Sequence, residues 1–493
     1  MNTTGKLEIY ALAAALALGI LGDGLLRNYP WGLNFGLWGC LLGVAIYSFG
    51  RARGQTFARG GWWLLLPIGL APLAFMWHDS LALDALNLLA LVTAFSLVVL
   101  RARGVRLHLA SMMQYAICGL LSGFNATLGM FPLLLEGREW TRSAQGGPVR
   151  KTVAAMFGLV LAFPPLMVFG GLFMGADAVF RSLAAQFLWA VPRHATLIVF
   201  LTVIVGGYLR GLITDKGLNL NAPAHRFPVS LGAVEMAVML GLLDLLFLAF
   251  VAVQVRYFLG GSALVKATTG LTYSEYARQG FFQLLAVAAL LLPFLLLCHW
   301  LLRAGDSASQ RWFRWLAGVQ IVLLFVIMAS AFERMHLYQA EYGMSEQRLY
   351  PTAFMGWLAV VFVWFALTVL RGQRQRFGFG AMVAGFLLIA VLHLLNPDAL
   401  IARTNLARVR DGHTFDAHYA ATLSGDAVPE LVAGLPDLNP KDRCTLARGL
   451  IERWPAADST DWRSWNLVRA RAWRAVSENQ AALHAACGKP AKD

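Results

Sequence analysis

Residues 333–350 read ERMHLYQAEYGMSEQRLY, a polar stretch between two of the most apolar stretches in the chain. The flanking segments, 313–333 and 351–370, each have the length of about 20 apolar residues that a helix needs to cross a bilayer. Within the polar stretch, Gly343 suits the position after a helix end, and Ser345 suits the N-cap of the next helix. The stretch therefore predicts two membrane-spanning helices joined by a tight turn.

The same apolar pattern continues outward over most of the chain. Of the 493 residues, 58% are hydrophobic and 14% are charged, and the mean hydropathy is +0.59, which is not typical of a water-soluble protein. We predict an all-α fold in which residues 1–395 form a polytopic helical membrane bundle of about eleven spans. The segments of sufficient apolar length are 8–25, 30–50, 62–77, 81–100, 152–178, 195–213, 229–253, 280–301, 313–333, 351–370 and 377–395.

The loops between these segments predict the orientation of the bundle. Alternate loops, together with Lys6, carry 20 lysines and arginines, whereas the opposite set carries 8. Because cytoplasmic loops are enriched in basic residues, we expect a cytoplasmic N-terminus in the inner membrane of a bacterium. The net charge of +14 therefore reflects topology, and we expect no nucleic-acid partner.

A further apolar segment, 108–135, does not fit this alternation as a full span. Both of its flanks belong to the basic set of loops, and the small polar run SGFNATLG interrupts it. We therefore expect it to be re-entrant or to lie in the membrane interface, with the Gly/Asn centre at its turn.

From residue 396 the composition changes to that of a soluble helical domain. Residues 396–493 contain short amphipathic segments, which predict a stack of helical hairpins of the tetratricopeptide kind. An odd number of spans places this tail outside the cytoplasm. There Cys444 and Cys487 are either joined in a disulfide or free on separate helices, and the sequence leaves both open. We expect the tail tryptophans to pack in its core: Trp462, Trp465 and Trp473.

Polar residues gather at the predicted outer ends of the helices. One interpretation is a polar cavity that binds an anionic or amphiphilic ligand through arginines, and the other is a set of contacts that dock the tail and cap helices. The residues concerned are Arg334, His336, Tyr338, Tyr342, Arg348, Asp84, His393 and Asn405.

Asp244 is the most unusual charge within the bundle. It lies in AVMLGLLDLLFLAF, residues 237–250, where an ionised carboxylate near mid-membrane costs about 2.5–3.5 kcal/mol. It is either a proton or ion relay or a structural hydrogen-bonding group. The chain carries no HExxH, phosphate-binding or nucleophile-elbow motif, so we expect no metal site and no cofactor, and catalytic residues remain unidentified.

Three ordered motifs resemble a known bacterial membrane family, domain of unknown function 4173. The first is YGMSEQRLY, with Tyr342, Gly343, Arg348, Leu349 and Tyr350 at the shared positions. The second is NPDALIARTNLAR, with Asn396, Pro397, Ile401, Ala402, Asn405 and Arg408, and the third is SGDAVPEL. The resemblance covers about residues 195–475 and departs from the family at Gln347, where an apolar residue is usual. It implies a multi-pass bacterial membrane protein and implies no activity.

Three functions fit these observations. The first is an envelope ligand-sensing or scaffolding protein whose bundle presents the tail to an envelope protein partner. The second is a proton- or ion-coupled transporter that uses Asp244, although no inverted repeat is visible. The third is a membrane-embedded transferase acting on lipid-linked envelope precursors, an interpretation that rests on architecture alone. Membrane lipid is an expected partner in each case.

Overall fold

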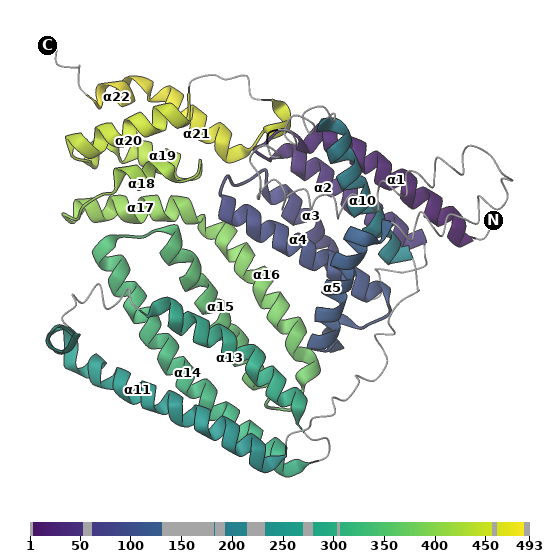
Figure 1. Ribbon diagram of the computed structural model, residues 1–493. Helices are drawn as coiled ribbons and strands as arrows, with labels where there is room; N and C mark the ends of the chain where they lie inside the picture. Colours follow the sequence, from purple (N-terminus) through teal and green to yellow (C-terminus); the bar gives the residue numbers. More distant parts are fainter. Residues whose placement is uncertain are drawn as a thin grey trace. The chain divides into compact units, whose positions relative to one another are not determined.

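The computed structural model describes residues 3–52, 62–130, 182, 193–213, 232–269, 280–302, 306–455 and 461–487 (Figure 1). These residues form helices and no strands, which confirms the all-α prediction for the described part of the chain. Contacts divide the chain into two compact units. The first comprises residues 1–107, 113–221 and 459–468, and the second comprises 108–112, 222–458 and 469–493.

The first unit is a bundle of apolar helices from the N-terminal part of the chain. Helix α1 packs against α10 and α2, and α3 packs between α2 and α4. Glycines allow close approach: a Cβ on Gly19 of α1 would lie 2.1 Å from Thr202 Oγ1 of α10. The elements are α1 (Thr3–Leu26), α2 (Leu33–Ala52), η1 (Trp62–Leu64), α3 (Leu65–Ala74), α4 (Leu81–Ala102), α5 (Met112–Leu128) and α10 (Arg193–Ile213), while η2 (Leu107–Leu109) falls at the division between the units.

Helix α5 corrects the expected break in segment 108–135. The run SGFNATLG does not form a turn, because α5 is continuous from Met112 to Leu128. Its Asn125 carbonyl lies against Gly207 of α10, where an added Cβ would come within 2.2 Å. Gly207 of α10 thus permits close packing of the two helices, as small residues commonly do in membranes, and α5 remains helical through Asn125. Residues 131–135 lie outside the described part of the chain.

Helix α3 is shorter than the expected span 62–77. Together, η1 and α3 end at Ala74, and 13 residues at about 1.5 Å per residue cover about 20 Å, less than the hydrocarbon core. The helix ends there because the carbonyls of the following residues turn to other partners: those of Phe75 and Met76 accept hydrogen bonds from Asn466 and Leu467.

The described residues contain nine helices that are long and apolar enough to cross a membrane, against about eleven predicted. The difference arises from α3 and from segment 152–178, which lies outside the described residues. The nine are Leu7–Leu26, Leu33–Ala52, Leu81–Ala102, His194–Ile213, Ala233–Gln254, Phe281–Leu301, Ser307–Tyr342, Glu346–Thr368 and Arg374–Leu395.

The second unit joins five long helices to the helices of the tail. Apolar side chains of α11, α13, α14, α15 and α16 share one buried core. The long helices are α11 (Ala233–Thr269), α13 (Phe281–Leu301), α14 (Ser307–Tyr342), α15 (Glu346–Thr368) and, after η3 (Arg374–Arg376), α16 (Phe377–Leu395). The tail elements are α17 (Pro397–Arg410), α18 (Ala417–Thr422), α19 (Val428–Ala433), η4 (Leu435–Asp437), α20 (Pro440–Arg453), η5 (Trp462–Ser464), α21 (Leu467–Glu478) and α22 (Gln480–Ala485), of which η5 belongs to the first unit.

The turn between α14 and α15 has the predicted form. Helix α14 ends at Tyr342, and Gly343 follows with φ +77°, a left-handed value that favours glycine. Ser345 then adopts an extended conformation at the N-cap of α15. The two helices extend beyond the expected segments 313–333 and 351–370, so the whole of ERMHLYQAEY is helical.

The tail helices enclose a second hydrophobic core, and a disulfide bond joins the chain at one edge of it. Leu446 and Leu450 of α20 are buried in it, together with residues of α17, α18 and α19. Cys444 of α20 and Cys487 form a disulfide, which is the first of the two alternatives left open. The boundary at residue 396 and the likeness to tetratricopeptide repeats stay predictions.

The tail tryptophans differ from the expected core packing. Trp473 contacts the tail core and lies edge-on to Trp454 at 5.9 Å between ring centroids. Trp462 and Trp465 are exposed, by 62% and 44%. They belong to η5 and the short connection before α21, where the Trp465 carbonyl accepts a hydrogen bond from Leu33 N.

Candidate functional site

Within the second unit, a cluster of polar contacts attaches the tail helices to the long helices. We define the tail joint as the contact of residues 338–349, at the α14–α15 turn, with α17 and Tyr419. At its centre, Asn405 of α17 binds Met344 twice. Met344 N donates to Asn405 Oδ1 at 2.8 Å, and Asn405 Nδ2 donates to Met344 O at 2.9 Å. One amide side chain thus pairs with both backbone groups of a turn residue.

A second α17 residue binds the end of α14. Arg408 Nη2 donates to Ala340 O at 2.6 Å and to Glu341 O at 3.0 Å. These carbonyls lie in the last helical turn, where intrahelical donors are lacking and a cation is favoured by the helix dipole. Gly343 makes the approach possible, because a Cβ there would lie 2.6 Å from Arg408 Nη1 and 2.7 Å from Asn405 Oδ1.

Arg348 closes the turn from its other side. Its guanidinium lies over the Tyr338 ring at 4.2 Å from the centroid, an arrangement that favours a cation. The same group donates to Tyr342 O at 3.0 Å and to Gly343 O. The N–H donors of the Arg348 guanidinium are therefore used within the chain's own α14–α15 turn.

Acidic residues form the far edge of the tail joint. Glu346 N donates to the Tyr419 hydroxyl at 2.9 Å, and burial raises the pKa of Tyr419 to about 12, which keeps the phenol neutral. Asp398 is buried, and its carboxylate accepts from Ser424 N at 3.4 Å. Burial above all, and then the nearby Asp426 charge, raise the pKa of Asp398.

The structure brings together only part of the predicted outer cluster. Tyr338, Tyr342, Arg348 and Asn405 meet in the tail joint. Arg334 is buried elsewhere on α14 and donates to Gln254 of α11.

The remaining predicted residues lie apart from the tail joint. His336 is exposed on α14, and His393 Nδ1 lies 2.9 Å from Ile389 O on its own helix. Asp84 belongs to the first unit, in the first turn of α4.

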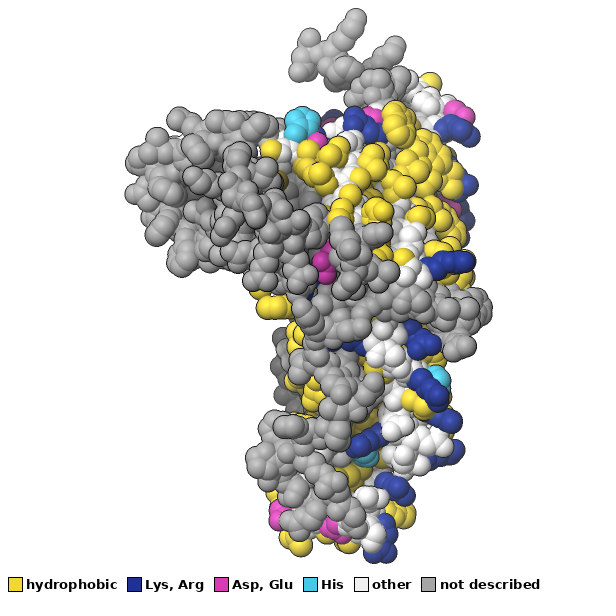
Figure 2. All heavy atoms as spheres, turned by 90° about the vertical axis from the view of Figure 1, so that its right-hand side faces the viewer, with side chains coloured by type: hydrophobic (Ala, Val, Ile, Leu, Met, Phe, Trp, Pro, Cys, Tyr) yellow, Lys and Arg dark blue, Asp and Glu magenta, His cyan; other side chains and the backbone are white. Residues whose placement is uncertain are grey.

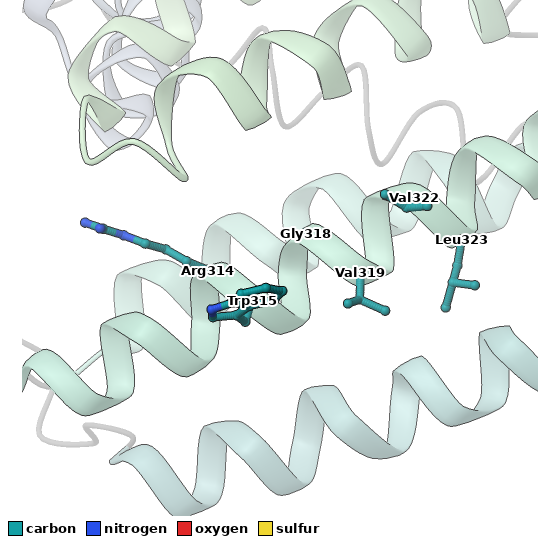
Figure 3. A pocket seen from close by; sticks show the side chains of 6 residues that line it. All are labelled: Arg314, Trp315, Gly318, Val319, Val322 and Leu323. Atoms are coloured by element: carbon teal, nitrogen blue, oxygen red, sulfur yellow. The ribbon is translucent and has the colours of Figure 1, made fainter.

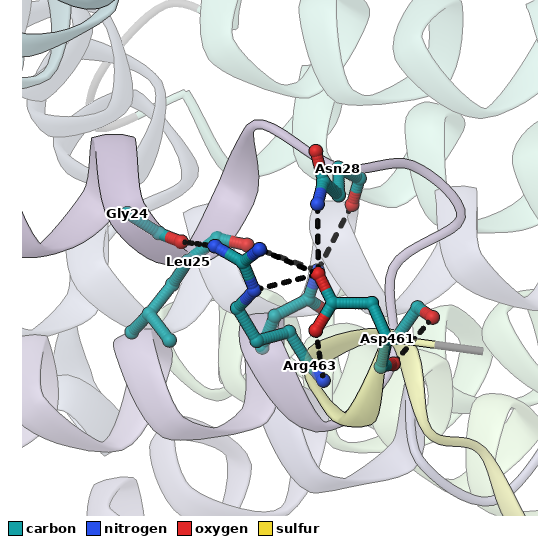
Figure 4. A network of polar contacts seen from close by, with 7 residues as sticks. Gly24, Leu25, Asn28, Asp461 and Arg463 are labelled. Atoms are coloured by element: carbon teal, nitrogen blue, oxygen red, sulfur yellow. Dashed lines mark hydrogen bonds and ion pairs between the residues drawn. The ribbon is translucent and has the colours of Figure 1, made fainter. Parts of the chain in front are cut away.

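Residues 461–467 belong to the first unit, and their contacts within it were not predicted. We define the hook as residues 461–467, which contact the ends of α1 and α3. Figure 4 shows its contacts through Asp461 and Arg463 with Gly24 and Asn28. Arg463 donates to Gly24 O at 2.6 Å, and Asn28 donates to Asp461 at 2.8 Å. Hydrogen bonds from Arg463 hold the pKa of Asp461 well below its usual range, so the carboxylate stays charged.

Asn466 fixes the other end of the hook. Its buried amide donates to Phe75 O at 2.8 Å and to His78 O at 2.7 Å. The backbone continues the contact, since Leu33 N donates to Trp465 O at 2.8 Å and Leu467 N to Met76 O at 2.8 Å. The available sequence signal was the polar residues of DWRSWN between two helical segments, a pattern also expected of an ordinary loop.

The first unit also contains an ion cluster between the ends of α1 and α10. Asp23 and Arg27, one turn apart on α1, pair with each other. His194 of α10 joins them, with Nδ1 2.7 Å from Asp23 Oδ2 and Nε2 2.6 Å from Arg27 Nη1. The three side chains satisfy one another and hold the ends of two helices together.

Asp244 lies on the inward face of α11, as its mid-span position requires. It is 8% exposed, and neither carboxylate oxygen has a hydrogen-bond partner among the described residues. No group of three histidine, cysteine or acidic side chains that would suit a metal ion occurs in the described part of the chain.

A shallow groove of about 500 Å³ runs along α14. Its lining is apolar apart from Arg314 at one end, beside Trp315 (Figure 3). Large apolar side chains also face outward along other candidate spans, and Figure 2 shows hydrophobic side chains gathered on the surface. Such surfaces suit contact with lipid.

The helices and the exposed apolar surface define the class: a multi-pass helical membrane protein. The chain belongs to the family called domain of unknown function DUF4153, whose profile matches residues 65–434. This supports an uncharacterised family, as the resemblance implied, but it does not support the number 4173. Searches of curated proteins and of solved structures gave no match.

Proposed function

We propose that the protein is a membrane scaffold whose bundle holds a helical tail for an envelope protein partner. The observation that carries the proposal is the tail joint, where Asn405 and Arg408 bind the backbone of the α14–α15 turn. Side-chain-to-backbone bonds at a helix end fix the direction in which α17 leaves the bundle. A presented surface needs such a fixed support.

The same contacts favour a scaffold over a ligand sensor. The two arginines expected to bind an anionic ligand are engaged by the chain itself: Arg348 by Tyr338 and turn carbonyls, and Arg334 by Gln254. A ligand would have to break these contacts. A contact that docks the tail leaves the hydrogen bonds of Arg348 and Arg334 in place.

We place the bundle in a bacterial inner membrane, with a cytoplasmic N-terminus and the tail outside. The uneven distribution of basic loops supports this orientation. The disulfide between Cys444 and Cys487 also supports it, because disulfides persist in oxidising compartments.

The test of this proposal uses photo-crosslinking in intact cells. A photo-reactive residue replaces exposed arginines of α21, Arg471 or Arg474 in turn, and adducts are compared between the parent and an Asn405→Leu variant. We expect discrete protein adducts that are lost when the joint is broken, while the amount of protein in the membrane is unchanged. Asn479→Ala, at an exposed tail position, is the matched control and should keep the adducts.

Two results would contradict the scaffold. One is the absence of adducts from either tail position. The other is adducts that persist unchanged in Asn405→Leu although hydrogen exchange shows that the joint has opened.

Membrane lipid is the second partner that we propose. The groove on α14 suits an acyl chain along Val319, Val322 and Leu323, with an anionic headgroup near Arg314. Val319→Trp should fill the groove and reduce the phospholipid that co-purifies with the protein. An unchanged lipid content would refute this site.

A proton- or ion-coupled transporter is the second candidate function, and the burial of Asp244 without a partner favours it. Asp244→Asn should then abolish solute-dependent proton uptake into proteoliposomes. Uptake equal to that of the parent would exclude Asp244 as the coupling group. No arrangement of the described residues favours the transferase alternative.

A further inference from the structure

The register of α11 and α14 brings two buried polar residues, Asp244 of α11 and Gln320 of α14, to the same level. Ser330 Oγ donates to Gln254 Oε1 at 3.2 Å, which links residues 76 apart in the sequence. Asp244 and Gln320 have the same 76-residue offset, ten residues or about 15 Å earlier along both helices.

The burial pattern of the two helices fits the parallel register that the Gln254–Ser330 hydrogen bond sets. The inward residues of α11 are Met236, Leu240, Asp244, Phe247, Val251 and Gln254. Those of α14, at offsets of 76 or 77 residues, are Phe313, Ala317, Gln320, Leu324, Ile327 and Ser330. Figure 1 shows the two helices side by side, and their buried residues share one core. Asp244 therefore faces α14 at the level of Gln320.

Both side chains are unsatisfied in this position. Gln320 is 0% exposed, and its Nε2 and Oε1 atoms, like both carboxylate oxygens of Asp244, have no hydrogen-bond partner within the described residues. Each unpartnered buried polar group costs about 1–3 kcal/mol. Four such atoms at one level of an apolar interface require a ligand or a change of protonation.

The surroundings determine which ligand fits. A metal cation needs several oxygen ligands, but the other buried residues of α11 and α14 within about one turn of this pair are apolar, and helix carbonyls are used in the helix. The charged group nearest along α14 on this face is Arg334, about 20 Å away by helix rise and bound to Gln254. Glu235, nine residues before Asp244, is exposed. A proton needs one carboxylate oxygen and removes the charge itself.

We propose that Asp244 and Gln320 form a buried proton-binding site. The carboxylate takes up one proton and becomes a neutral acid, whose O–H donates to Gln320 Oε1 while Gln320 Nε2 donates to the acid carbonyl. A small rotamer change makes this reciprocal pair and satisfies all four atoms. Proton release leaves a carboxylate facing the amide oxygen, so protonation and the α11–α14 contact are coupled.

This site goes beyond the scaffold and does not require transport. A scaffold with such a site has a bundle contact that tightens when the proton binds. Neither failure of the tail joint nor absence of solute uptake would affect it.

Infrared spectroscopy of the purified protein in lipid nanodiscs tests the site directly. At neutral pH we expect a carbonyl stretch of a protonated carboxylic acid, which shifts on exchange into D₂O and is absent in Asp244→Asn. Gln320→Leu keeps the acid but removes its partner, so the band should move to higher frequency. Glu341→Gln, which alters an exposed carboxylate on the same helix, should leave it unchanged.

Two outcomes would overturn the proposal. One is a spectrum without a protonated-acid band that depends on Asp244. The other is an Asp244 band that is identical with and without the Gln320 side chain. If Asp244→Asn does not fold, the shift in Gln320→Leu still decides, because that variant retains the acid and adds no charge.

Discussion

Replacing Asn405 by alanine isolates the central contact of the tail joint. The change removes the donor and the acceptor that pair with Met344 at 2.9 and 2.8 Å. At about 1 kcal/mol for each hydrogen bond, we expect the joint to lose about 2 kcal/mol. Alanine also raises the helix propensity of α17, so a loss cannot come from a weaker helix.

Hydrogen exchange at the turn measures this loss. In the regime where opening is at equilibrium, about 2 kcal/mol corresponds to roughly thirty-fold faster exchange of the Met344 amide. Asn405→Asp keeps the acceptor and loses the donor, so it should give a smaller increase. Asn479→Ala removes a hydrogen bond to Ala475 O at the end of α21 and should leave Met344 unchanged.

The reasoning would be refuted by exchange within about twofold of the parent in Asn405→Ala, because twofold is less than about 0.5 kcal/mol. It would also be refuted if Asn479→Ala had the same effect as Asn405→Ala. That result would show that the turn responds to any change in tail stability.

Three further predictions follow from the tail. Arg408→Ala should destabilise the end of α14 by about 1–3 kcal/mol, because two backbone carbonyls lose a charged donor. Arg410→Ala removes an exposed ion pair with Asp437 and should cost at most about 1 kcal/mol. Hydrogen exchange of the Gly343 amide distinguishes the two variants. Replacing Cys444 and Cys487 by serine opens a cross-link between residues 43 apart and should destabilise the tail by about 4 kcal/mol in the chain-entropy model, measured by thermal unfolding. Folding raises the pKa of Asp398, so the stability that its protonated form contributes is complete below the ordinary pKa of 3.8 and is lost as pH rises through the folded-state pKa. The Asp398→Asn variant should therefore lose less stability than the parent between acid and neutral pH, measured by thermal unfolding at a series of pH values. Equal pH slopes for the two proteins would contradict this.

The sequence predicted features that depend on local rules. Apolar length alone located most long helices, and Gly343 with Ser345 located the turn between α14 and α15, because a left-handed residue and a helix start have strong residue preferences. It also selected Asn405 and Arg348, two of the residues that meet in the tail joint.

Features that depend on distant partners were not predictable in the same way. Segment 108–135 remains helical through Asn125 because Gly207, on another helix, gives it room. The hook depends on Asn466 reaching Phe75 and His78, which lie almost 400 positions earlier in the chain. Asp244 was identified from its own sequence, but Gln320 became relevant only through the register of α11 and α14.

The most direct test of the scaffold is an experimental structure of the protein in lipid nanodiscs, purified with its native lipids. The account predicts α17 seated on the α14–α15 turn, with the Asn405 amide on Met344 and Arg348 over Tyr338, and no other molecule between them. A bound anion or amphiphile held by Arg348, with α17 displaced from residues 343–345, would contradict it.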